Sequence, residues 1–333
     1  MTVPRFKAGQ GLDKIPSDKE EWHEAIIKYG LQRRTLEQLC LERRFSASTV
    51  PKEAFLTMRC IWPKKKHPAY ASTYIANLEY FFNEDNSDDA RKLMNENALG
   101  LDKLRALYRI VCSPKEPRKV TPPEYINPSF HQRTSTARSS PKNCILRRSA
   151  NSFETTYTFG PVRNTSQQQD DVRFRARIDG SIPFGVSLAM MPREAVIFEA
   201  KRAPRGNNED SIPVLTQQSM EHVAYIWRRH EKDSTWEKSV NIYHTFMVAQ
   251  DHLYFHISIG TYDSTYLKYI FGSGTQSVVP GQGENSFLEI QEFGLFKVGD
   301  EEAIDAFLHI MLSLILWQLE QTNAGSTFKA ALS

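Results

Sequence analysis

Three residues in the second half of the chain have the types and the spacing of a phosphodiester-cleaving site. Glu199 and Lys201 are separated by one residue at the end of the apolar run that starts at Val196, so on a strand their side chains share one face. Asp179, twenty residues before Glu199, ends an alternating segment that begins at Val172. If the two strands are neighbours in a sheet, Asp179, Glu199 and Lys201 meet at one end of that sheet.

This residue set suits metal-assisted hydrolysis. The carboxylates of Asp179 and Glu199, with the carbonyl oxygen of Ala200 between them in space, offer the hard oxygen ligands that Mg²⁺ or Mn²⁺ prefers. Such an ion lowers the pKa of a bound water and offsets charge on the scissile phosphate. The ammonium group of Lys201 would position that water. We therefore expect Asp179, Glu199 and Ala200 to bind metal, and Mg²⁺ or Mn²⁺ to be the cofactor.

Basic residues near this set are candidates for contacts with nucleic acid. Arg173, Arg175 and Arg177 alternate along the segment before Asp179, so they share one strand face and would hold flanking phosphates. We add Arg202 and the basic run Lys64–Lys66 to the predicted nucleic-acid contacts.

The elements that must position these residues alternate between strands and helices. Periodicity predicts the strands over 172–179, 194–203, 243–249, 253–259 and 287–298, and the helices over 215–230 and 301–321. This order indicates an α/β or α+β sheet domain. Gln218 shares one face of the first helix with Glu221, His222 and Tyr225. Asp251 falls between two strands, where we expect a hairpin turn, and the scattered histidines are expected in core or surface roles.

Taken together, Asp179, the gap of twenty residues, Glu199-x-Lys201 on an apolar strand and the following helix resemble the PD-(D/E)xK nuclease superfamily, which includes restriction enzymes. Four segments are further similar to nuclease-like proteins of fungi; they are Phe198–Arg202, Gln218–Trp227, Phe246–Asp251 and Ile259–Tyr262. The resemblance covers about residues 151–322. It implies an α/β fold with a restriction-endonuclease-like mixed central sheet flanked by helices.

The resemblance also implies roles for individual residues. Asp179 and Glu199 would bind the metal, Lys201 would assist the attacking water, and a glutamine of the next helix would support the site. Gln217 or Gln218 is the matching position, and we assign Gln218. Ile178 stands where the family name has proline, and no Gln-x-x-x-Tyr pattern follows. The family's extra acidic residue has two candidates here, which are Glu96 and Glu154.

The first half of the chain has a different character. Residues 1–112 read as a helical region, and three short helices over 18–62 resemble a helix-turn-helix, the third running from Pro51 to Trp62. A small helical bundle with a solvated basic end is the alternative. Residues 113–150 are basic and rich in proline and serine, which predicts a linker. That linker would be a phosphate-contacting arm, a nuclear-localisation patch or a plain tether. Residues 323–333 form a tail.

Charge separates the two halves. The formal net charge is +3, but residues 1–150 hold 27 Lys and Arg against 17 Asp and Glu, whereas residues 151–333 hold 15 against 22. The basic half is therefore the part expected to attract a polyanion. The four cysteines form no CxxC pair, which argues against a zinc knuckle, and no apolar run is long enough to span a bilayer. With no signal-peptide pattern at residue 1, we expect an intracellular protein, nuclear or cytoplasmic.

The sequence thus predicts a metal-dependent nuclease, an endonuclease or exonuclease that acts on DNA rather than RNA, with no membrane partner. The possibility of a homodimer stays open. The alternative is a catalytically inactive nuclease-like fold that serves as a nucleic-acid-binding or protein-interaction module. In that case the N-terminal helices and the basic linker would do the binding.

Overall fold

The structure is a computed structural model of the whole chain. It describes residues 7–36, 38, 45–76, 91–92, 155–160, 174–184, 193–201, 211–231, 242–271, 277–280 and 286–320. Of Lys201 the backbone alone is described. Other predicted features lie outside the described residues; they are Arg173, Arg202, Glu96, Glu154, the linker over 113–150 and the tail over 323–333.

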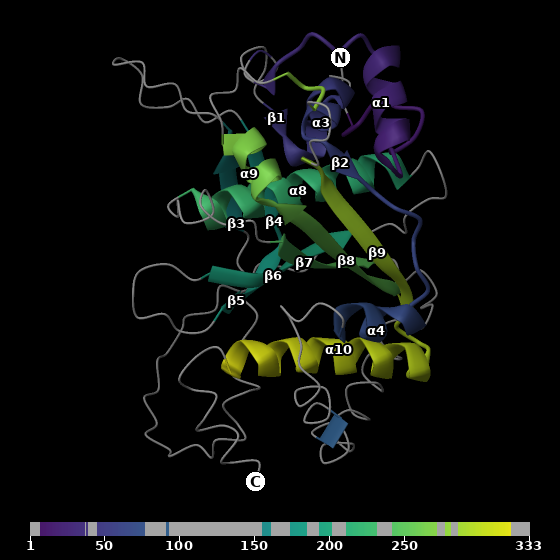
Figure 1. Cartoon of the computed structure of the whole chain (residues 1–333). Coiled ribbons are helices and arrows are strands. Elements are labelled where there is room, and N and C mark those ends of the chain that lie inside the picture. The colour runs from purple at the N-terminus through teal and green to yellow at the C-terminus, as the bar shows by residue number, and fades with distance from the viewer. Residues whose placement is uncertain are drawn as a thin grey trace, which may run out of the picture.

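Two mixed sheets form the framework (Figure 1). The larger sheet has six strands in the order β2 (Cys60–Ile61), β9 (Leu288–Lys297), β8 (Tyr254–Asp263), β7 (Ile242–Asp251), β6 (Arg193–Lys201) and β5 (Gly180–Phe184). Its pairs are antiparallel except β6 with β7 and β2 with β9, which are parallel. The smaller sheet has the order β1 (Phe45–Ser46), β4 (Phe174–Ile178) and β3 (Thr155–Phe159).

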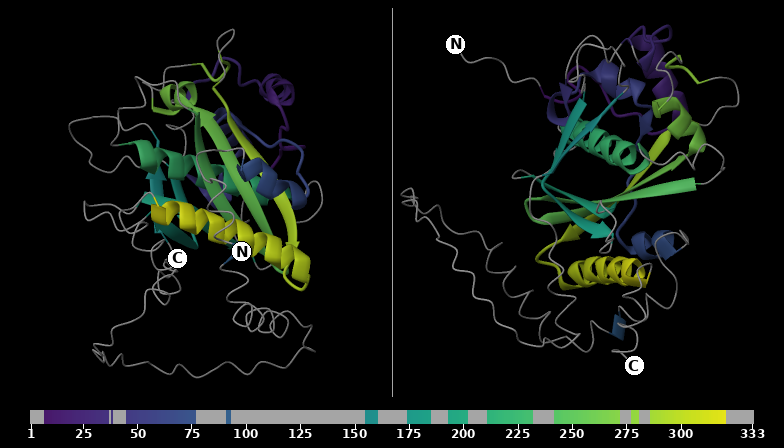
Figure 2. Two further views of the ribbon diagram at one scale, coloured as in Figure 1. Left: turned by 60° about the horizontal axis from the view of Figure 1, so that its bottom comes forward. Right: turned by 90° about the vertical axis from the view of Figure 1, so that its left-hand side faces the viewer.

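Helices cover both faces of the larger sheet (Figure 2). Helix α8 (Ile212–His230) lies on one face and also packs on the smaller sheet, while α10 (Glu301–Glu320) and α4 (Ala69–Ala76) lie on the other face. The remaining described helices are α1 (Lys19–Lys28), the short η1 (Ala47–Thr49), α3 (Lys52–Thr57) and α9 (Ser264–Phe271). The α/β class predicted from the sequence is confirmed in this general form. None of the described helices has the length and apolar character that crossing a membrane requires.

The strand and helix patterns explain this layering. In β4, Phe174, Ala176 and Ile178 are buried and the two residues between them are exposed, as expected for a strand with one covered face. The central strand β7 is buried along most of its length, because α8 covers one face and α10 the other. Helix α8 begins with a proline in its first turn, where the missing N–H leaves no helical bond unmade.

The predicted helix over 51–62 is shorter in the structure. Helix α3 ends at Thr57, and Cys60–Ile61 form β2, which pairs with β9. Residues Ala54–Thr57 of α3 are buried. The third helix of the predicted helix-turn-helix is therefore shorter than expected and buried at its end, and most of the second helix lies outside the described residues.

The described N-terminal residues share a core with the sheet domain. The indole N–H of Trp62 donates to Ser219 Oγ of α8 at 2.7 Å, and the hydroxyl of Tyr266 donates to the carbonyl of Met58. Arg59 is buried, donates to the carbonyl of Val278, and lies 3.6 Å from the ring centroid of Tyr269. A buried guanidinium must be paired within the protein. The described residues between 7 and 62 are thus part of the same folded unit as the described residues between 155 and 320.

Two buried histidines, His222 and His244, should make the folded protein less stable in acid. His222 has Nδ1 2.7 Å from Thr245 Oγ1 and Nε2 3.0 Å from Ser258 Oγ, and burial lowers its pKa to about 3. Burial and the nearby charge of Arg229 lower the pKa of His244 to about 4. Below about pH 6.5 these histidines bind protons in the unfolded chain but not in the folded chain. Their contribution to the free energy of unfolding is therefore complete above that pH and is lost as the pH is lowered.

We expect the free energy of unfolding, measured in urea, to fall between pH 7 and pH 4.5. His222 alone contributes a slope of about 1.4 kcal/mol per pH unit below about pH 6. The variant His222→Gln should flatten this slope, and the same change at the exposed His23 should leave it as it is. An unchanged slope in His222→Gln would contradict the assignment.

Candidate functional site

Asp179 lies where the chain passes from the smaller sheet to the larger one. Its backbone N–H donates to the carbonyl of Phe198 at 3.1 Å, and the N–H of Ala200 donates to Asp179 Oδ2 at 2.7 Å. The strand beside β6 is β5, whereas the predicted neighbour, β4, pairs in the other sheet. Even so, the carboxylate of Asp179 reaches the backbone between Glu199 and Lys201, as the sequence predicts.

Glu199 faces helix α8 and meets a second carboxylate there. The side-chain nitrogen of Gln217 donates to Glu199 Oε1 at 2.9 Å and to Glu221 Oε1 at 2.7 Å. Gln217 and Glu221 are four residues apart, so they share one face of α8. Glu199 is 4% exposed and Glu221 is fully buried. Two buried carboxylates therefore converge on one electropositive NH₂ group.

Gln217 takes the place that the sequence analysis gave to Gln218. Gln218 is fully buried, and its amide makes no hydrogen bond within the described part of the chain. Consecutive helical residues point about 100° apart, so a shift of one position takes the side chain off the face that meets Glu199. Sequence analysis missed the role of Glu221, although its spacing of four from Gln217 was visible.

The predicted arginine stripe lies on the other side of its strand. Arg175 and Arg177 are exposed, and the alternating residues Phe174, Ala176 and Ile178 are buried in the core shared with α8. Because Glu199 faces α8 through Gln217, the structure does not bring these arginines together with Glu199 on one face.

The run Lys64–Lys66 follows β2 and lies along the neighbouring strand β9. The N–H of Lys66 donates to the carbonyl of Glu292 at 2.9 Å, and the side chain of Gln291 donates to the carbonyl of Lys64 at 3.0 Å. All three lysines are exposed, and Lys66 Nζ lies 4.7 Å from the centroid of the Tyr74 ring. The backbone of this basic segment is thus fixed to the sheet.

A second polar cluster, which sequence analysis did not find, contains Asp251, His256, Glu292 and Lys65. Asp251 was predicted in a hairpin turn, but it is the last residue of β7 and is buried. Its Oδ1 atom lies 2.7 Å from His256 Nε2, and Glu292 Oε1 lies 2.6 Å from His256 Nδ1. These partners come from three strands, which is why a local pattern could not reveal them.

The donor types of the first cluster fit a hard divalent cation. Carboxylate oxygens of Glu199 and Glu221 already share one amide NH₂ donor, and Mg²⁺ and Mn²⁺ favour such oxygens. Asp179 reaches the same strand through the Ala200 N–H. Among the described residues, no three His, Cys, Asp or Glu side chains are close enough together to hold a metal ion. Binding would therefore require the amide of Gln217 to move aside.

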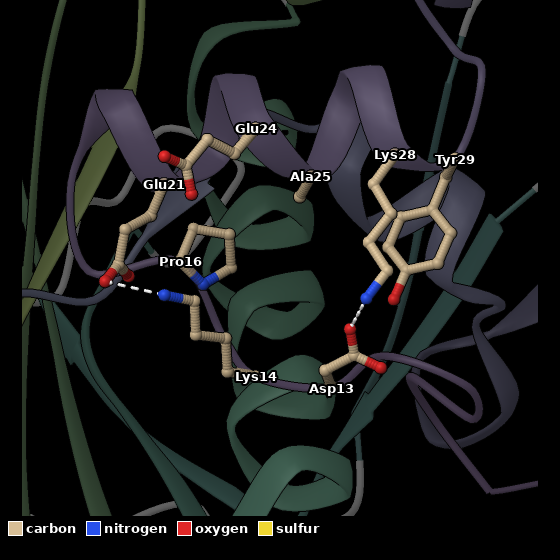
Figure 3. A pocket seen from close by; sticks show the side chains of 8 residues that line it. All are labelled: Asp13, Lys14, Pro16, Glu21, Glu24, Ala25, Lys28 and Tyr29. Atoms are coloured by element: carbon tan, nitrogen blue, oxygen red, sulfur yellow. Dashed lines mark hydrogen bonds and ion pairs between the residues drawn. The ribbon is translucent and has the colours of Figure 1, made fainter.

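A pocket of about 230 Å³ lies elsewhere, between α1 and the loop before it (Figure 3). Its charged groups pair with one another, Lys14 with Glu21 at 2.8 Å and Lys28 with Asp13. Hydrogen bonds from Lys14 and from the N–H of Ser17 lower the pKa of Glu21 to about 2. The pocket contains none of the predicted site residues, and its paired charges leave it no evident ligand.

The two glutamines should respond differently to the same substitution. Gln217→Leu removes two hydrogen bonds to buried carboxylates and should lower the free energy of unfolding by about 2–3 kcal/mol. Gln218→Leu replaces an amide that has no described partner, so the change should stay within about 1 kcal/mol. Urea unfolding at pH 7.5 measures both. Equal losses, or a larger loss for Gln218→Leu, would contradict this reading of α8.

Comparison with known proteins adds no relative. No protein-family model matches the chain, and neither does any curated protein or any solved structure.

Proposed function

We propose that the chain is a metal-dependent nuclease that hydrolyses phosphodiester bonds of nucleic acid, DNA rather than RNA. The observation that carries the proposal is the pair of buried carboxylates, Glu199 on β6 and Glu221 on α8, that share the amide of Gln217, with Asp179 bound to the adjacent N–H of Ala200. Acting on DNA, the protein would work in the nucleus or the cytoplasm.

The arrangement of elements supports the proposal. β6 lies inside a mixed sheet flanked by helices, between antiparallel β5 and parallel β7, and α8 follows it in the chain. This is the arrangement that the resemblance to the PD-(D/E)xK superfamily implies for a Glu-x-Lys strand. A restriction-endonuclease-like fold is therefore part of what we propose.

Each residue of the cluster has a proposed role. Glu199 and Glu221 would hold Mg²⁺ or Mn²⁺, with Asp179 and the carbonyl of Ala200 beside them. The ion would lower the pKa of a bound water and stabilise the charge of the phosphate. Until an ion binds, Gln217 holds the two carboxylates side by side through its hydrogen bonds. Lys201 would hold the attacking water, and the exposed Lys64 and Lys66 would contact the phosphate backbone, whereas Lys65 is paired with Glu292.

Cleavage by the full chain tests the proposal. Incubation with plasmid DNA, linear DNA and RNA should give Mg²⁺- or Mn²⁺-dependent cleavage that EDTA stops. Glu199→Gln keeps the shape of the side chain but removes its charge, so we expect a loss of at least about 100-fold. Glu289→Gln, on the exposed side of β9, is the matched control and should cleave normally. The full chain is needed, because residues 7–62 form part of the core.

No cleavage by the wild type with either ion would reject the nuclease proposal. Normal cleavage by Glu199→Gln would reject the assigned site.

Metal binding gives a readout that does not depend on activity. An ion that binds the folded chain at 100 times its Kd stabilises it by about 2.7 kcal/mol, which predicts a rise of about 5 °C in Tm. Mn²⁺ should produce this rise in the wild type and not in Glu221→Gln. A chain that is stabilised by DNA but not by Mn²⁺ would instead support the inactive binding module.

A further inference from the structure

The cluster of Asp251, His256, Glu292 and Lys65 is a connected chain of charged groups. The imidazole of His256 lies between two carboxylates, and Lys65 Nζ lies 3.1 Å from Glu292 Oε1. His256, Asp251 and Glu292 are buried, whereas the side chain of Lys65 is 38% exposed. Each ring nitrogen of His256 therefore faces a carboxylate oxygen, which accepts hydrogen bonds, and Lys65 Nζ also lies 3.2 Å from Nδ1.

This network lies beside the proposed site. Glu199 is the register partner of Ala249, and Ala249 is the register partner of His256, so the three residues form a row on one face of the sheet. Lys201 is in turn the register partner of Asp251 on the parallel strand. The hydrogen bond from His256 to Asp251 therefore fixes the end of β7 that supports Glu199 and Lys201.

The fold makes room for His256 in two ways. Phe255 pairs with Phe296 and Ile257 with Phe293, so β9 has one residue more than β8 at this point and forms a bulge across from His256. Bulges re-aim side chains and are frequent next to active sites. Gly294 of β9 lies across from the ring, and a Cβ there would come within 3.1 Å of His256 Nδ1. Replacing buried charges by apolar residues is often neutral or stabilising, so stability alone is a weak reason for this network.

We propose that His256 is a positioning residue. Through Asp251 it holds the end of β7 against β6, and it thereby sets Glu199 and Lys201 for the reaction. Glu292 and Lys65 hold the other side of the ring. This inference rests on the proposed nuclease function and extends it to residues that contact neither metal nor substrate.

Steady-state cleavage with Mn²⁺, measured well below the Tm of each variant, tests the inference. His256→Asn should lower kcat by about 10- to 100-fold with little change in KM, as is usual for groups that orient a site from behind. Asp251→Asn should lower kcat to a similar extent. The kcat of the double variant should be no lower than that of the less active single variant, because the two residues act as one unit. The rise of Tm with Mn²⁺ should persist in all three.

His252→Asn is the matched control. His252 is exposed in the turn beside the network and has a φ of 53°, which asparagine tolerates. Its kcat should equal that of the wild type. Lys65→Met changes the exposed end of the network, so it should fold even if His256→Asn does not. We expect a lower kcat and an unchanged KM for Lys65→Met.

The outcomes separate the two proposals. Wild-type cleavage together with an unchanged kcat in His256→Asn and Lys65→Met would overturn the positioning role and leave the nuclease function standing. A rise in KM alone in Lys65→Met would also overturn it, since that result means direct contact with substrate. A wild type that cleaves nothing would reject the nuclease function itself.

Discussion

Helix α8 is enclosed by protein on nearly every side, and this constraint governs the chemistry of the molecule. Twelve of its nineteen residues are buried, and several of them are polar. A buried polar group without a partner is costly, and apart from Thr216 and Gln218 the buried polar side chains of α8 bond to neighbours. Gln217 bonds two carboxylates, Ser219 receives the indole N–H of Trp62, and His222 lies between two hydroxyl groups. The carboxylate pair proposed as the site is one result of this constraint.

The N-terminal residues complete the enclosure of α8 and the edge of the sheet. β1 extends the smaller sheet and β2 extends the larger one. The segment after β2 runs along β9 and places Lys65 against Glu292. A charge excess in the first half of the sequence therefore does not identify a separate binding domain. Part of that basic charge belongs to the sheet that carries Glu199.

Local patterns predicted the elements well, and the contacts between distant segments less well. The strand that carries Glu199, the helix after it and the reach of Asp179 to that strand all followed from periodicity and spacing. The choice of Gln218 over Gln217 was wrong, because neighbouring positions of a helix point in directions about 100° apart and only Gln217 faces Glu199. His256 and its partners could not be predicted, since a bulge and pairing between strands bring them together. The predicted end of helix α3 was wrong because Cys60 and Ile61 form β2, which pairs with a strand more than 220 residues later.

The pairing of β2 with β9 has a consequence for how the protein is made. Cys60 and Ile61 pair with Leu288 and Glu289, and the guanidinium of Arg59 donates to the carbonyl of Val278. All of these partners are synthesised more than 200 residues later. During synthesis these contacts of residues 59–61 cannot form until nearly the whole polypeptide has left the ribosome. Contacts of such long sequence separation fold slowly and leave apolar surface exposed meanwhile. Chains interrupted before residue 290 are thus expected to be substrates for chaperones and proteases, with no folded N-terminal fragment to accumulate.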